Sequence, residues 1–146
     1  MSTRDHRDHE LADRLHSAAI HLLRRLRIQD RAAGIGPAKL SALSVLVFSA
    51  RPLSLAQLAA IEQVKNPTMS RLVGAMKKEG LVRAGPAKDD ARSIRITPTA
   101  RGRALLLAGK RRRIDSLARA VNTLPAPELR HLERAAELLD ELIGRL

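Results

Sequence analysis

Apolar residues recur every three or four positions in several stretches of the chain, the spacing of one face of an α-helix. The first stripe predicts a helix over about residues 11–31, and Gly34 to Pro37 break the pattern. A second helix follows and ends before Arg51-Pro52. The residues of the first stripe are Leu11, Leu15, Ala18, Leu22 and Leu26, and those of the second are Leu40, Leu43, Leu46 and Val47.

Local signals in the middle of the chain predict two more helices separated by a turn. Ser54 to Gln57 form a capping box that starts a short helix. After a turn at about residues 62–65, Asn66 is expected to cap the next helix and Pro67 to occupy its first turn. Gly80 is expected to end that helix in the left-handed conformation.

Two short strands and a long helix are predicted next. Residues 81–84 form the first strand, a loop runs from Gly85-Pro86 through Asp89-Asp90, and residues 93–97 alternate as an exposed hairpin strand does. Thr99 is expected to cap a helix that reaches about Asn122. The order of helix, turn, helix and hairpin over residues 54–97 is a winged helix-turn-helix.

The last helix carries the clearest pattern, a heptad seam of apolar residues from position 129 to position 146. A helix this apolar must be buried against something. We expect a homodimer in which this helix packs with the first and the long fifth helix; burial within one subunit is the alternative. The seam consists of Leu129, Leu132, Ala136, Leu139, Ile143 and Leu146, widened by Leu138 and Leu142.

The expected fold class is therefore mostly α with a small β-wing: a winged helix-turn-helix domain plus N- and C-terminal dimerisation helices. Residues 1–10 are assigned to a flexible tail and residues 11–146 to a single domain. Its winged core spans about 37–98, and its dimerisation helices span about 11–31 and 99–146.

Composition narrows the function classes. The chain has one aromatic residue, Phe48, and no cysteine, which disfavours base-stacking platforms and thiolate zinc sites. The N-terminus lacks the apolar run of a secretory signal. The longest uncharged apolar stretch, residues 40–50, is too short to span a bilayer. We expect a cytoplasmic protein without membrane contact, cofactor or metal.

The positive charge is concentrated in one third of the chain. Residues 65–113 hold 14 basic and 3 acidic residues, whereas the other 97 residues hold 13 basic and 12 acidic ones. A balanced protein with one basic block is expected to present one face to a polyanion.

The second helix of the pair is expected to enter the major groove of double-stranded DNA with its N-terminal residues. Arg71 is suited to a bidentate contact with guanine, and Thr68 shares its face. Ser70 is expected to reach a base or a phosphate. The complete major-groove set is Asn66, Pro67, Thr68, Ser70 and Arg71.

These residues resemble the MarR family of bacterial transcriptional regulators. The similarity lies in Leu55 to Ala59, Asn66 to Val73, Lys78 to Val82, the wing Asp90 to Ser93, and Thr99 to Gly102. It covers the whole chain in element order and is specific in sequence over about residues 54–106. Three departures stand out: Gln63 replaces the usual glycine of the turn, Lys65 the usual serine cap, and Pro98 an apolar strand residue.

The resemblance implies a dimer on a pseudo-palindromic operator. It also implies that Arg92 enters the minor groove while Asp90 orients it, in keeping with the attraction of arginine to narrow grooves. The alternative without a DNA-binding role is that Asp90 and Arg92 form only an ion pair at the hairpin tip. The candidates for phosphate contacts are Ser54, Lys65, Lys77, Lys88 and Arg95.

Other clusters carry weaker signals. The run from Lys110 to Arg113 lies in the middle of a helix, and a solvated face or a cover over acidic groups is favoured over DNA contact. His6 and His9 lie in the expected tail without fixed geometry for a metal. His21 lies beside the first apolar stripe, where an interface role is favoured over an effector site.

The favoured function is a dimeric, sequence-specific regulator of transcription, in the resembling family most often a repressor released by a small ligand. A small enzyme is disfavoured because the chain lacks a nucleophile–base pair, a metal cluster and a phosphate loop. A nucleic-acid-binding protein without sequence preference is the remaining alternative, and competition with random duplex DNA separates it from a regulator.

Overall fold

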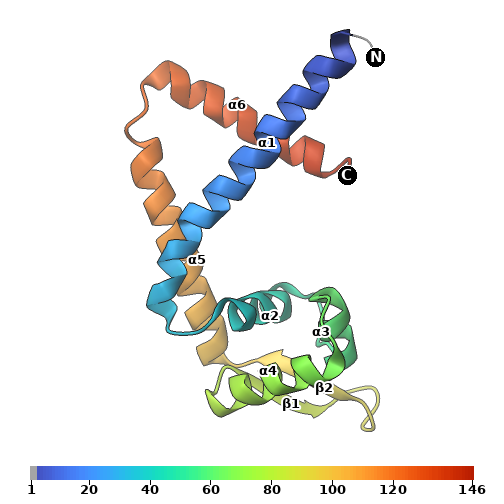
Figure 1. The fold of residues 1–146 in the computed structure, drawn as a ribbon. Helices are drawn as coiled ribbons and strands as arrows, with labels where there is room; N and C mark the ends of the chain where they lie inside the picture. The colour runs from blue at the N-terminus through green and yellow to red at the C-terminus, as the bar shows by residue number, and fades with distance from the viewer. Residues whose placement is uncertain (1–2) are drawn as a thin grey trace.

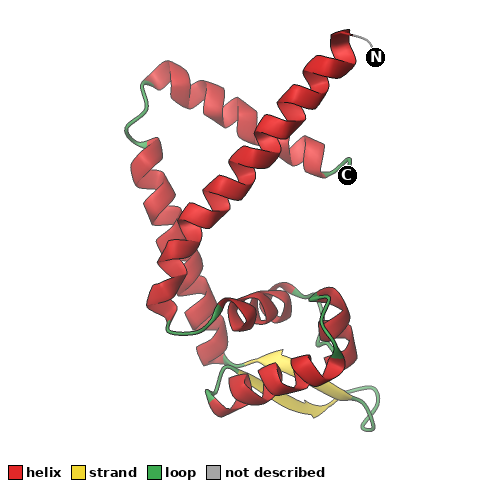
Figure 2. Ribbon diagram, viewed as in Figure 1, coloured by secondary structure: helices red, strands yellow, loops and turns green. Residues whose placement is uncertain are grey.

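The computed structural model describes residues 3–146, which form helices and one small sheet. A compact lobe contains α2, α3, α4 and the hairpin, whereas α1, α5 and α6 extend from it as a long arm (Figure 1). Within residues 3–146, strands occur only in the lobe (Figure 2). The predicted fold class, a mostly helical winged helix-turn-helix with long terminal helices, is therefore confirmed.

The first helix, α1 (Thr3–Arg27), begins earlier than the apolar stripe indicated. Residues 3–10, assigned above to a tail, are helical; this assignment was wrong because it followed apolar periodicity alone. Polar pairs four residues apart support the added turns: Arg4 with Asp8 at 4.0 Å and His6 with Glu10 at 3.2 Å. Residues 1 and 2 lie outside the described part of the chain.

The break after α1 has the expected glycines. A 3-10 helix, η1 (Ile28–Ala33), ends at Gly34, whose φ of 71° is left-handed. Helix α2 (Pro37–Phe48) then starts with its proline in the first turn and buries Leu43 and Leu46. Among residues 3–146 no single helix is long and apolar enough to span a membrane. The segments Thr3–Ala33 and Pro37–Phe48 have the length and apolar composition only together, and they are bent by 94° at the break between them.

Helices α3 (Leu55–Ile61) and α4 (Asn66–Lys78) form the helix-turn-helix. The capping box is confirmed, because Ser54 and Gln57 each accept a backbone N–H from the other. The predicted cap at Asn66 is wrong. The N-cap is Lys65, which makes no side-chain cap bond, and Asn66 is already helical since the helix extends one residue further back than expected.

The wing is an antiparallel hairpin of β1 (Val82–Pro86) and β2 (Ile94–Pro98). Leu53 adds one bridge to Ile96, whose N–H donates to the Leu53 carbonyl at 2.8 Å. Pro98 is tolerated because it is the last residue of β2. The hairpin, α2, α3 and α4 enclose one core, to which Leu106 also belongs. Its largest fully buried side chains are Leu43, Leu58, Met69, Met76, Leu81 and Ile96.

The arm is completed by α5 (Ala100–Val121) and α6 (Ala126–Ile143). Thr99 caps α5 as predicted, accepting the N–H of Gly102 at 3.0 Å. The predicted terminal helix is also present, but none of its residues is buried in the single chain. The heptad seam of α6 therefore lies open, and the division into a winged core and dimerisation helices stays a prediction.

Candidate nucleic-acid interface

The first two turns of α4 expose a polar face, while the opposite side of the helix is buried. Met69, Val73 and Met76 are buried in the core at the spacing of one helical face. The five predicted major-groove residues are all exposed and lie together on the outer side of the same helix: Asn66, Pro67, Thr68, Ser70 and Arg71. We call these five residues the polar face of α4.

The side chain of Arg71 lies back along its own helix. Its Nε donates to the Pro67 carbonyl oxygen at 3.4 Å, one turn earlier. This bond is long for N–H···O and lies at the surface, so little free energy holds the guanidinium there. Arg71 is therefore free to exchange this partner for another acceptor in front of the helix.

The turn that presents α4 is held in a strained conformation. Gln63 has a φ of 55°, the left-handed region that favours glycine, and it is the single non-glycine residue with positive φ among residues 3–146. The N–H of Val64 donates to the Ala59 carbonyl at 3.0 Å and closes the turn. The sequence left two possibilities at Gln63, strain or a different turn, and the structure shows strain.

The other end of α4 is fixed by contacts that sequence spacing did not reveal. Lys39 of α2 forms an ion pair with Glu79 at the C-terminus of α4. The Thr99 hydroxyl donates to the Gly80 carbonyl at 2.6 Å, and the Thr99 N–H donates to the Leu81 carbonyl at 3.0 Å. These contacts join the end of α4 to the start of α5, and they link residues too far apart for a local pattern.

The tip of the wing is shaped by Asp90 through the backbone. Its Oδ1 accepts the N–H of Arg92 at 3.0 Å, and its carbonyl accepts the N–H of Ser93 at 3.0 Å. This is the usual turn-forming bond of aspartate to the residue two positions on. Neither the expected carboxylate–guanidinium contact nor an ion pair joins Asp90 and Arg92 within residues 3–146, so the exposed Arg92 side chain projects free of Asp90.

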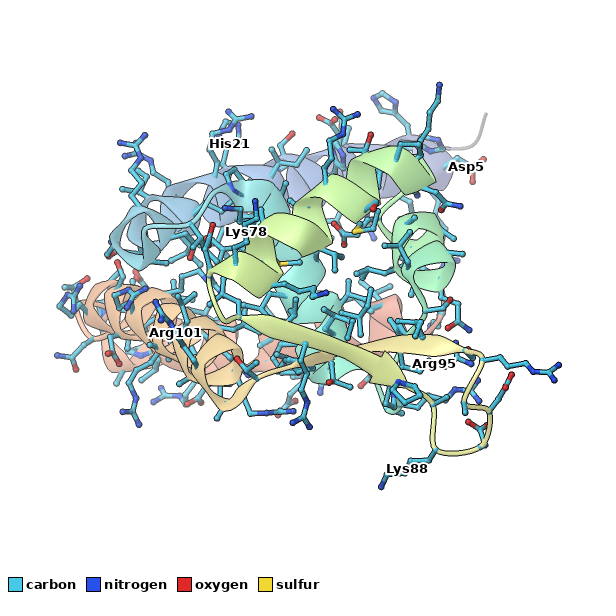
Figure 3. The ribbon with its side chains drawn as sticks, turned by 90° about the horizontal axis from the view of Figure 1, so that it is seen from below. Asp5, His21, Lys78, Lys88, Arg95 and Arg101 are labelled. Carbon is cyan, nitrogen blue, oxygen red and sulfur yellow. The ribbon has the colours of Figure 1, made fainter. Side chains whose placement is uncertain are left out.

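The predicted phosphate-contact residues are arranged around this surface. Lys65, Lys77 and Lys88 are exposed, at the two ends of α4 and in the wing loop. Ser54 uses its hydroxyl oxygen to cap α3, and Arg95 donates to Gln57 Oε1 at 3.3 Å. Seen from below, α4 and the hairpin occupy the same side of the lobe, with Lys88 and Arg95 projecting from the hairpin (Figure 3).

The basic run of α5 is partly engaged inside the chain. Arg113 forms an ion pair with Asp30 of η1, and the Lys110 ammonium lies 5.6 Å from the centre of the Phe48 ring. These contacts join α5 to η1 and α2. The favoured interpretation, that part of this run covers an acidic group, fits the Asp30 pair; contact of the run with DNA stays untested.

The histidines show no metal-binding arrangement. His6 pairs with Glu10, and His9 Nδ1 lies 3.0 Å from the Asp5 carbonyl oxygen, both along α1. Over residues 3–146 no group of three or more acidic or histidine side chains is placed to hold a metal ion. His21 is exposed on α1, so its proposed interface role depends on a partner.

Comparisons with known proteins agree with this geometry. Residues 33–93 match the model of the MarR family. The uncharacterized HTH-type transcriptional regulator Mb0904 of Mycobacterium bovis is 30% identical over 136 residues, which cover 93% of this chain and 94% of that protein.

Solved structures show the same fold. The transcriptional regulator Tm0710 of Thermotoga maritima superposes with a TM-score of 0.82 at 19% identity, covering 94% of this chain and 96% of its own. A point mutant of MepR from S. aureus, solved bound to an oligodeoxyribonucleotide, has a TM-score of 0.68 at 18% identity, covering 93% of this chain and 98% of its own. The chain thus belongs to the MarR family, as a DNA-binding helix-turn-helix regulator of transcription and not an enzyme.

Proposed function

We propose that this protein is a dimeric repressor that binds a pseudo-palindromic operator in the cytoplasm and is released by a small-molecule effector. The observation that carries the proposal is the polar face of α4, exposed beside a wing whose Arg92 is free. An element with buried apolar residues on one side and exposed hydrogen-bonding residues on the other is suited to the major groove.

Specific reading is assigned to few residues. Arg71 takes guanine O6 and N7, while Thr68 and Ser70 offer hydroxyls to neighbouring base edges. Asn66 and Pro67 set the approach of the first turn to the DNA. Arg92 enters the adjacent minor groove, where a narrow A·T-rich segment concentrates negative potential. The S. aureus MepR mutant, which has this fold and was solved bound to an oligodeoxyribonucleotide, supports DNA binding by the fold.

Dimerisation is supported by apolar side chains that the single chain leaves open on the arm. In α6, Leu139 is 41% exposed and Ile143 is 66% exposed. In α1, Leu11 is 54% exposed and Leu22 is 47% exposed. Rows of exposed apolar side chains on two helices are expected to be covered by a partner, and a second copy gives a two-fold dimer with one winged lobe per half-site.

Release by an effector would be a shift between dimer conformations. A ligand that binds more tightly to a dimer with the wrong spacing of its winged lobes weakens operator binding by its differential affinity for the two states. No cysteine is present to make this chain a thiol switch.

Selection of bound sequences from random duplex DNA tests the proposal. A pseudo-palindrome with half-sites about one helical turn apart is expected, bound roughly 10³-fold or more above random duplex. Sedimentation of the free protein is expected to give a dimer. Equal competition by random duplex at physiological salt would refute specific regulation and favour a structural DNA-binding protein.

A further inference from the structure

A pocket of about 530 Å³ lies between the hairpin and the start of α3. It is bounded by the segment Arg51-Pro52, by Gln57 of α3, by the start of the wing loop and by one face of the hairpin. Four cations and one carboxylate line it: Arg51, Arg83, Lys88, Arg95 and Asp89. The pocket is therefore a concentrated positive site beside the proposed wing contact.

The register of the hairpin explains why these side chains gather. Arg83 pairs with Thr97, and Gly85 pairs with Arg95, so these residues share one face of the two-stranded sheet. Ile96 lies on the opposite face and is 2% exposed. Gly85 has no side chain opposite Arg95, and a Cβ placed there would have no atom within 4 Å, so the face is hollow at this point.

The cations of this pocket form no ion pair within residues 3–146, although the Asp89 carboxylate also lines the pocket. Arg83 Nε donates to the Thr97 hydroxyl at 3.2 Å, and Arg95 Nη1 donates to Gln57 Oε1 at 3.3 Å. Neither arginine, nor Arg51 or Lys88, forms an ion pair within residues 3–146. Two guanidinium groups are thus oriented by neutral partners, and their remaining N–H donors are available to an oxyanion.

We propose that this pocket is an oxyanion site for phosphate chemistry, with Arg83 and Arg95 as its oriented donors and Arg51 and Lys88 at its rim. The phosphate has two sources: a backbone phosphate of the duplex beside the wing, or a free phosphate group. Only the first source rests on the proposed function. A free phosphate would occupy the site without DNA and would compete with the backbone there.

A carboxylate placed inside the pocket tests the site without removing its structure. Gln57→Glu keeps the residue that a capping box accepts at this position and supplies an internal counter-ion to Arg95. Arg83→Gln removes one donor by a different route. Arg119→Gln is the matched control, because it makes the same change of one charge at the far end of α5, where the side chain is exposed.

The first arm measures thermal midpoints of the full chain in inorganic phosphate and in chloride at equal ionic strength. At a phosphate concentration ten times the dissociation constant of phosphate, binding is expected to raise the thermal midpoint of wild type and Arg119→Gln by about 3–6 °C. The rise is expected to be lost in Gln57→Glu and Arg83→Gln. The general salt effect of phosphate is common to all four proteins and cancels in this comparison.

The second arm measures the slope of log affinity against log salt on the selected duplex. Loss of one backbone contact lowers the slope by roughly 0.9, which is expected for the two pocket variants and not for Arg119→Gln. A lower salt slope in the pocket variants identifies a DNA backbone phosphate as the ligand. Loss of the phosphate-induced midpoint rise in these variants, without a change of salt slope, identifies a free phosphate. If the pocket variants have the same phosphate-induced midpoint rise and the same salt slope as wild type, the oxyanion site is refuted, even where operator binding persists. If wild type shows no preference for the operator, only the proposed function as a regulator is refuted.

Discussion

Gly102→Ala is expected to destabilise the protein strongly, because Gly102 seats the first turn of α5 on the backbone that follows α4. A Cβ at this position would lie 2.1 Å from the Leu81 carbonyl oxygen, 2.9 Å from its carbonyl carbon and 3.2 Å from Leu43 Cδ1. The first two atoms belong to the backbone and cannot swing away as a flexible side-chain end does.

The loss of stability follows from the contacts that would be disturbed when the added Cβ pushes Leu81 and α5 apart. Overpacking of this kind costs about 1–3 kcal/mol. Moving Leu81 away from α5 also weakens the bonds that Thr99 makes to the Leu81 and Gly80 carbonyls, at about 0.5–1.5 kcal/mol each. Alanine regains roughly 1 kcal/mol of helix propensity over glycine. The net loss is about 3 kcal/mol, which lowers the midpoint by roughly 6–12 °C.

Thermal and urea unfolding at one fixed protein concentration measure this loss, since association shifts apparent stability. Gly74→Ala is the matched control: Gly74 lies within α4, and its added Cβ would meet no atom within 4 Å. That variant is expected to gain about 0.5–1 kcal/mol. If Gly102→Ala were as stable as wild type, or if Gly74→Ala lost as much free energy of unfolding, the joint between α4 and α5 would not be tightly packed.

Three further substitutions test the helix-turn-helix and the wing. Gln63→Gly is expected to raise the free energy of unfolding by about 0.5–1 kcal/mol in urea titrations by relieving the left-handed strain; a lower value would show that the Gln63 side chain stabilises the turn. Arg71→Ala is expected to cost about 1–3 kcal/mol of binding at one base position per half-site, and an equal loss on every duplex would contradict base reading. Arg92→Ala is expected to weaken binding most on operators with A·T-rich flanks, so affinities independent of flank composition would argue against minor-groove insertion.

Local chemistry made the helix-turn-helix predictable from sequence. The capping box at Ser54 and the left-handed glycine at position 80 depend on residues within a few positions of each other, and both formed as expected. Asn66 failed as a cap because α4 begins one residue earlier than its capping preference indicates, with Lys65 at the N-cap position and without a side-chain cap bond. A boundary error of one residue is usual when helix ends are placed from local preference.

Contacts across the chain were not predictable in the same way. Lys39 and Glu79 are 40 positions apart, and Thr99 reaches back 19 positions to Gly80; no periodic pattern marks either pair. At the wing, the pair Asp90 and Arg92 was visible as a motif. Its geometry was not, because one carboxylate can accept a backbone N–H as readily as a guanidinium.

The joint at Thr99 fixes the start of α5 to the end of α4, so that α5 acts as a lever on α4. The 22 residues of α5 extend about 33 Å, so a tilt of about 6° at the joint moves the far end by roughly 3.4 Å, the rise of one base pair per strand. In the proposed dimer, α5 belongs to the arm through which the two copies associate, so a few degrees at each joint would decide whether both copies of α4 reach successive major grooves.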